Sequence, residues 1–543
     1  MITMKLYRRI DWLVVTALAA VMLLSLVIRL PALTWPLNQQ PQAHCCEHPD
    51  EENHYEVFRS FPSSSSEAQH APGYAFSVYI ADHFGLGRAA EFFIPAGVPD
   101  LTLARGVYTG RLVSFLSSFL VLWLVYLLGR RSDVAGPLAA SATALVVLSP
   151  LFLVYSIYGL PDVLNIAVIL GYVYAFLRWT RFHTLSWLLA FAFLLGAAFA
   201  VKLGILIGAP LVLYVLLVSR RPARAAALLT LVMATGAVLV SGGSFGLARM
   251  QSVFDMVYSE NVKAAERSIL WNMIHYSVSI VPGMGVHFAI ILSVSAIGWA
   301  FWSRTGLSGW QKLVSHPWFA VTLGCAFHFG VSLSFGDPFA RHMLVLYPFL
   351  AIFAITGISY LSFFRTPTVM SLVLILSIAL SAFAAWPVLR SFRNDPNIAA
   401  ARWLKKNTDP DDCILFSQYS GRAKQFLGAK TDASCERKGS SPRFITIHSH
   451  WSGRFTGSWW LKPRPKNPGE VYKFNADRML RFGDRSRELV FWQALFDGRA
   501  RDWRIVAVFG DDWWTLEWMF LTLIGRGYDQ FVTTGKIAIA KEL

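Results

Sequence analysis

Charged residues are scarce in this chain. Asp, Glu, Lys and Arg together make up 15% of its 543 residues, whereas 55% are hydrophobic and the mean hydropathy is +0.45. A soluble globular domain has about 25% charged residues. The composition therefore excludes a soluble protein and predicts a chain embedded in a lipid bilayer.

Motifs for nucleotide chemistry are also missing. The sequence contains no Walker loop, no dinucleotide fingerprint that follows a strand, and no nucleophile elbow. Each of these motifs supplies a phosphate cradle or an activated serine, so their absence argues against nucleotide-dependent or serine-based catalysis.

Cysteines are few, with five in the whole chain. Three histidines and two cysteines lie close together at His44, Cys45, Cys46, His48 and His54. Their spacing matches no zinc signature, so we predict no metal ligands and no required cofactor, and leave open whether a divalent ion assists. Further along, Cys413 and Cys435 are a candidate disulfide pair that sequence alone leaves undecided.

Long apolar stretches occur eleven times, each roughly long enough to cross ~30 Å of hydrocarbon as a helix. We predict about eleven transmembrane helices, near residues 11–33, 105–128, 134–155, 162–179, 184–201, 203–218, 225–246, 279–303, 317–335, 341–361 and 367–389. Thirteen Lys and Arg residues fall in the segments on one side and five in the short segments opposite. The positive-inside rule then places the N-terminus in the cytoplasm and the C-terminus outside.

The chain is predicted to have two parts. Residues 1–390 hold every span, with a long first extracytoplasmic loop at 34–104. Residues 391–543 regain charge and contain no further span, which predicts a soluble extracytoplasmic domain. Asp395–Leu404 has the apolar spacing of an amphipathic helix. Short strands are expected at Cys413–Ser417, Phe444–His448, Val506–Phe509 and Ile537–Ala540. The fold class is therefore a polytopic α-helical membrane protein with a C-terminal α/β domain.

The net charge of +16 is a value that nucleic-acid-binding proteins also reach. Here the basic residues of the inner segments lie at the ends of predicted helices, where topology and lipid headgroups account for them. We therefore predict the membrane as a partner and no nucleic acid.

Acidic residues lie on the predicted outer side. Asp50 and Glu51 follow His48 in a cluster just beyond the first span. A carboxylate held near helix ends is suited to act as a general base toward a hydroxyl, although a solvated acidic loop would have the same composition. Asp162 opens the 162–179 span and is either the N-cap of that helix or a residue that faces a cavity.

Basic residues occur on the same side. Lys202 interrupts an apolar stretch, and either binds a phosphate or extends to the membrane interface. Arg341 and His342 open another span; Arg341 has donors suited to phosphate, or pairs locally with Asp337. Acids and bases on one leaflet are what a reaction on a lipid-linked phosphate requires.

The chain resembles the GT-C superfamily of polytopic glycosyltransferases. The resemblance is greatest to the branch of protein O-mannosyltransferases and the lipid A aminoarabinose transferase. Four segments carry it, namely His48–Glu51, Tyr155–Asp162, Arg341–Pro348 and Asp395–Leu404. The architecture extends the resemblance over the whole chain, and the first motif is the most specific.

The resemblance implies an enzyme of the inner (plasma) membrane that uses a polyprenyl-phosphate sugar as donor. Asp50 would be the general base for an inverting transfer to an acceptor hydroxyl, supported by Glu51, and Asp162 would match a second acidic position. The candidate substrate-binding residues are Lys202, Arg341, His342 and His48. The acceptor is a lipid, a glycan or a protein. The single α/β domain, in place of a β-trefoil-like insertion, argues against a protein.

Two other classes of protein are weighed against a transferase. A transporter or flippase of lipid-linked sugars needs charged groups along a path through several helices, and the predicted spans are almost free of charge inside. A membrane scaffold with an extracytoplasmic binding domain would show less convergence of acids and bases at one leaflet.

Overall fold

The computed structural model describes the secondary structure of both parts of the chain. It describes residues 2–33, 72–94, 98, 100–202, 204–243, 269–303, 316–333, 340–393, 396–409, 412–416, 427, 443–448, 495, 500, 502–509 and 537–542. These residues divide into two compact units. The first comprises the described residues up to Ala385 except residue 98, and the second comprises residue 98 and the described residues from Trp386 onward.

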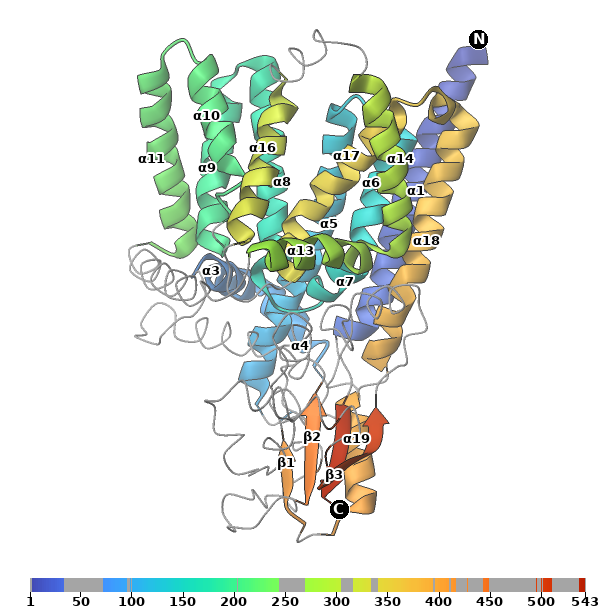
Figure 1. Cartoon of the computed structure of the whole chain (residues 1–543). Helices are drawn as coiled ribbons and strands as arrows, with labels where there is room; N and C mark the ends of the chain where they lie inside the picture. Colours follow the sequence, from blue (N-terminus) through green and yellow to red (C-terminus); the bar gives the residue numbers. More distant parts are fainter. Residues whose placement is uncertain are drawn as a thin grey trace. The chain divides into compact units, whose positions relative to one another are not determined.

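The first unit is a bundle of helices (Figure 1). Its α-helices are α1 (Ile2–Leu33), α3 (Pro72–Ala81), α4 (Gly87–Glu91), α5 (Leu101–Arg131), α6 (Gly136–Val147), α7 (Pro150–Tyr155), α8 (Pro161–Phe182), α9 (Leu185–Lys202), α10 (Gly208–Val218), α11 (Pro222–Ser241), α13 (Ile269–Met284), α14 (Val286–Ser303), α16 (Pro317–Ser332), α17 (Tyr347–Ser359) and α18 (Pro367–Arg393). Shorter helical turns are η1 (Asp82–Leu86), η3 (Ala340–Leu346) and η4 (Ser362–Arg365).

The predicted helical membrane fold is confirmed. Each of the eleven predicted apolar stretches contains helix. Among the described residues, seven helical segments are long and apolar enough to cross a membrane, and three shorter apolar helices accompany them. The long helices α1 and α18 pack together with α6 through Val14, Ala17, Ala140 and Leu374 (Figure 1). The protein is therefore a multi-pass membrane protein.

Two of the predicted spans differ from the structure. The 134–155 stretch is two helices, because Pro150 holds Ser149 in extended backbone and cannot continue the ladder of α6. The twelve residues of α6 reach only about 18 Å. The stretch predicted from 279 is interrupted at Gly285, whose φ of 96° separates α13 from α14.

Only the end of helix α13 was predicted, as the start of the 279–303 span. This helix lies crosswise to the long helices (Figure 1) and packs against α7, α14 and η3. Some of its apolar side chains are buried in the bundle and others are not: Tyr276 is fully buried, whereas Ile269 and Leu270 are exposed. Such a helix is amphipathic, so the length criterion for a membrane span does not detect it.

Two arginines inside the predicted spans are fully buried, which corrects the expectation that these spans are almost free of charge. The Arg29 guanidinium of α1 donates to Ser118 Oγ (2.8 Å) and to the Val147 carbonyl (3.1 Å). Arg111 of α5 donates to the Leu33 carbonyl (3.2 Å). Val147 and Leu33 are the last residues of α6 and α1. Each arginine thus satisfies a carbonyl at a helix C-terminus, where the helix dipole favours a cation.

Replacing Arg29 by Met should destabilise the bundle. Met fills much of the volume but leaves the Val147 carbonyl unpaired, which should lower the free energy of unfolding by about 1–3 kcal/mol. Arg130 is the matched control because it is exposed and donates to the Val134 carbonyl at a similar distance, 3.2 Å. Arg130→Met should change stability by less than about 0.5 kcal/mol. Denaturant unfolding in micelles compares the two, and equal losses would contradict this account.

The second unit contains a four-stranded sheet and helix α19 (Pro396–Asn407). The strands β1 (Ile414–Phe416), β2 (Phe444–His448), β3 (Trp503–Phe509) and β4 (Ile537–Glu542) lie in the order β1-β2-β4-β3. β1 and β2 are parallel, and β4 is antiparallel to β2 and β3. The predicted helix and four strands, and with them the α/β character of this part, are confirmed.

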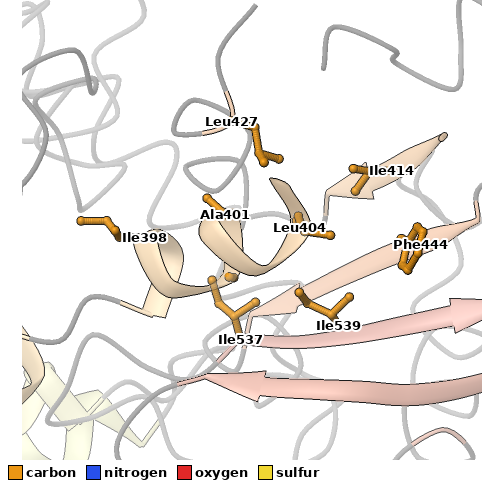
Figure 2. Packing of buried hydrophobic residues seen from close by; sticks show 9 residues of the cluster. Ile398, Ala401, Leu404, Ile414, Leu427, Phe444, Ile537 and Ile539 are labelled. Carbon is orange, nitrogen blue, oxygen red and sulfur yellow. The ribbon is translucent and has the colours of Figure 1, made fainter. Parts of the chain in front are cut away.

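The core of this unit forms between α19 and one face of the sheet (Figure 2). Ile398, Ala401 and Leu404 of α19 pack against Ile537 and Ile539 of β4. These side chains are buried because their i, i+3 and i+6 spacing places them on one helix face. Cys413, just before β1, is disulfide-bonded. Cys435, its predicted partner, lies outside the described residues.

Candidate functional site

The turn that leads into α8 is held firmly against α5. Ser114 donates to the Leu160 carbonyl (2.9 Å), and the Tyr74 hydroxyl bonds both Ser114 Oγ and the Gly110 carbonyl. Gly159 lies so close to α5 that an added Cβ would be 3.2 Å from the Val107 carbonyl oxygen. This close approach fixes the backbone immediately before Asp162, which stands in the first turn of α8.

Asp162 forms an ion pair with Lys202, the last residue of α9. The Asp162 side chain is 4% exposed and that of Lys202 is 31% exposed. The residue at the N-cap position of α8 is Leu160, so the capping alternative for Asp162 is wrong. The carboxylate lies at the positive end of the helix dipole and beside an ammonium, and both stabilise its charge. The Lys202 side chain is thus much less buried than that of its partner.

Packing of α3 against α9 fixes the position of Lys202. Gly73 of α3 lies against the backbone of Ala200, where an added Cβ would come within 2.7 Å of the carbonyl carbon and oxygen. No larger side chain fits between the two helices there. The last turn of α9 is therefore confined on one side by α3 and on the other by α8 (Figure 1).

His342 lies in η3, which packs against α8 and α13. Its Nδ1 is 3.0 Å from the hydroxyl of the buried Tyr276, and its backbone carbonyl oxygen is 3.1 Å from His328 Nε2. When Tyr276 donates to Nδ1, the ring proton resides on Nε2, from which it can be donated to an anionic oxygen.

The structure therefore brings together part of the predicted site. Asp162 and Lys202 are in contact, and His342 lies on η3, which packs against α8. Arg341 adjoins His342 in η3. Asp50, Glu51 and His48 lie outside the described residues, as does Asp337, the alternative partner of Arg341.

Sequence reasoning missed three polar residues around the pair, namely Asn165, Tyr276 and His328. Asn165 follows Asp162 by three residues on α8, a spacing that places both on one face and was available from the sequence. The described residues contain no group of three or more His, Cys, Asp and Glu side chains placed to hold a metal ion.

One segment of the chain matches a known protein family. Residues 104–243 match the model of the dolichyl-phosphate-mannose-protein mannosyltransferase family. This segment contains both Asp162 and Lys202. The chain has no match among curated protein sequences.

Several solved structures are similar to the chain. ArnT from Cupriavidus metallidurans bound to undecaprenyl phosphate is 13% identical with a TM-score of 0.47, over 81% of this chain and 93% of ArnT. The Archaeoglobus fulgidus oligosaccharyltransferase in the apo form is 12% identical with a TM-score of 0.47, over 82% of this chain and 70% of the other. The S. cerevisiae Pmt1-Pmt2 complex bound to its sugar donor is 19% identical with a TM-score of 0.33, over 44% and 34%.

The class of protein follows from the helical membrane bundle and the family match. The chain is a multi-pass membrane protein whose residues 104–243 are similar to a family of glycosyltransferases. This match bears out, for the central segment, the resemblance to protein mannosyltransferases that the sequence predicted.

Proposed function

We propose that this protein transfers a sugar from a polyprenyl-phosphate donor to an acceptor hydroxyl at the extracytoplasmic face of the plasma membrane. The observation that carries the proposal is the Asp162–Lys202 pair, which lies inside the glycosyltransferase-family segment. The pair presents a partly exposed lysine side chain beside a buried carboxylate. The phosphodiester that joins the sugar to the lipid in such a donor is an anion that a lysine can bind.

In the proposed reaction the acceptor oxygen attacks the anomeric carbon of the donor. The bond between that carbon and the phosphate oxygen breaks, its electron pair stays with the phosphate, and the acceptor proton moves to the Asp50 carboxylate. Attack opposite the leaving group inverts the anomeric configuration. The transition state gathers positive charge on the sugar and negative charge on the departing phosphate, so it requires a carboxylate near the first and cations near the second.

Each candidate residue then has a role. Asp50 is the general base and Glu51 supports it. Lys202 and Arg341 stabilise the phosphate, and Asp162 holds the Lys202 ammonium in position. His342 donates a hydrogen bond to the phosphate from Nε2, with Tyr276 on its other nitrogen. His48 contributes to substrate binding from the first loop.

The test is sugar transfer by the purified protein in detergent or nanodiscs. Labelled polyprenyl-phosphate sugars of several kinds are offered with membrane extracts as acceptor, and the anomeric configuration of the product is determined by NMR. We expect transfer from at least one donor, with inversion. Tight binding of donors without transfer of any of them would overturn the proposal and favour a transporter or a scaffold.

A further inference from the structure

Asn165 is a buried polar side chain whose Oδ1 has no partner among the described residues. The residue is 7% exposed, and among the described residues no group forms a hydrogen bond with its Oδ1. Buried amides are almost always hydrogen-bonded, because an unpaired one loses its bonds to water and gains nothing in exchange. The missing hydrogen bond to an amide oxygen in a candidate site is therefore expected to come from a bound ligand.

The amide lies one helical turn from the Asp162–Lys202 pair. Asp162 and Asn165 are three residues apart on α8, so their side chains project from the same face of the helix. This face is turned toward the end of α9 and the residues just beyond it, since Asp162 pairs with Lys202 and Asn165 Oδ1 lies next to Gly204. A Cβ at Gly204 would collide with Oδ1. Because glycine has no Cβ, the Asn165 amide oxygen has room next to this position.

Tyr172, two turns further along α8, is a polar residue on the same face with a protein partner. It donates its hydroxyl proton to the Gly204 carbonyl at 3.1 Å. The hydroxyl farther from the ion pair is therefore satisfied by protein, whereas Asn165 Oδ1 has no partner among the described residues. From this contrast we infer that the Tyr172 hydroxyl has a structural role, whereas the Asn165 amide oxygen is available to a ligand.

We propose that Asn165 binds a hydroxyl group of the donor sugar and thereby contributes to selection of that sugar. The inference rests on the proposed function, since it takes the ligand to be a polyprenyl-phosphate sugar. The neighbouring Lys202 supplies the charge that the phosphate needs. A neutral amide, with one acceptor and two donors, matches a hydroxyl, which both donates and accepts.

The test compares two ligands in wild type and Asn165→Leu. The ligands are bare undecaprenyl phosphate and the sugar-bearing polyprenyl phosphate that wild type binds best. Leu has the same number and branching of side-chain heavy atoms as Asn and no polar atoms. We expect the affinity for the bare lipid phosphate to stay within about twofold, and that for the sugar-bearing lipid to fall about tenfold, the loss of one hydrogen bond. The melting temperature should equal or exceed that of wild type, because an unpaired buried amide has been removed.

Tyr172→Phe is the matched control. It removes a hydrogen bond from the same helix face, but one that protein already satisfies, so it should lower the melting temperature and leave the preference for the sugar-bearing lipid unchanged. If Asn165→Leu does not fold, Asn165→Ala tests the same preference. Equal binding losses for both lipids, or no loss for either, would overturn the role of Asn165.

The outcomes separate this inference from the proposed function. Absence of transfer by wild type from every donor would overturn the proposed function. The preference of wild type for sugar-bearing over bare lipid phosphate can be measured even without transfer. If the Asn165 variants keep that preference, the role proposed for Asn165 is wrong, whatever the outcome for transfer.

Discussion

Asp50→Asn should abolish sugar transfer while the protein still inserts and binds its donor. A general base typically contributes about 10²–10⁴ in rate, and Asn cannot take up the proton of the attacking hydroxyl. We expect the turnover number to fall at least about 1,000-fold. Affinity for the donor should be kept or rise, because a negative charge near the donor phosphate is removed.

The matched control for this variant is Glu67→Gln. It makes the same change of charge in the same predicted loop, outside the His48–Glu52 cluster, and should leave transfer within about twofold. Turnover is measured with labelled donor in nanodiscs, and donor binding by a separate titration. Comparable turnover in wild type and Asp50→Asn would show that another group accepts the proton.

Lys202→Met should weaken binding of a polyprenyl phosphate about 100-fold and also destabilise the fold. The two effects have different origins. The first reflects the loss of a cation that the phosphate contacts. The second arises because the Asp162 carboxylate, 4% exposed, would remain buried without its partner. Breaking such a pair costs about 3–5 kcal/mol.

A double variant separates these effects. Asp162→Asn/Lys202→Met removes both charges, so stability should return toward that of wild type. Binding of undecaprenyl phosphate should remain about 100-fold weaker, whereas Asp162→Asn alone should bind it as well as wild type or more tightly. Thermal unfolding and lipid titration are carried out on wild type, the two single variants and the double variant. Together they form a double-mutant cycle for stability and for binding. Recovery of binding in the double variant would mean that Lys202 serves only to neutralise Asp162.

Much of the architecture follows from local pattern. The length of the apolar stretches predicts the helices because a bilayer leaves few other ways to satisfy a backbone. The small C-terminal sheet was also predictable, since β2 runs over Phe444–His448 as expected and the other three strands differ by a few residues at their ends. In contrast, nothing in local sequence places β4, the last strand, between β2 and β3.

The candidate site shows where local pattern ends. Asp162, Lys202 and His342 were recognisable as ionisable groups near the ends of apolar stretches, but each kept a structural alternative. Their partners are distant in sequence: Lys202 follows Asp162 by 40 residues, and Tyr276 precedes His342 by 66. The part of α13 that carries Tyr276 was not predicted as a helix, because a helix that lies across the bundle lacks the uniform apolar character of a membrane span.

By itself, the sequence determined that this protein is a polytopic membrane protein and indicated its resemblance to glycosyltransferases, because hydrophobic length, charge bias and short motifs are local properties. Only the tertiary structure decided that Asp162 pairs with Lys202 and does not cap α8, that Arg29 and Arg111 are buried at helix ends, and that Asn165 Oδ1 lacks a partner among the described residues. Burial and pairing depend on which helices pack together. That choice is made by contacts between segments far apart in the chain, which no local pattern records.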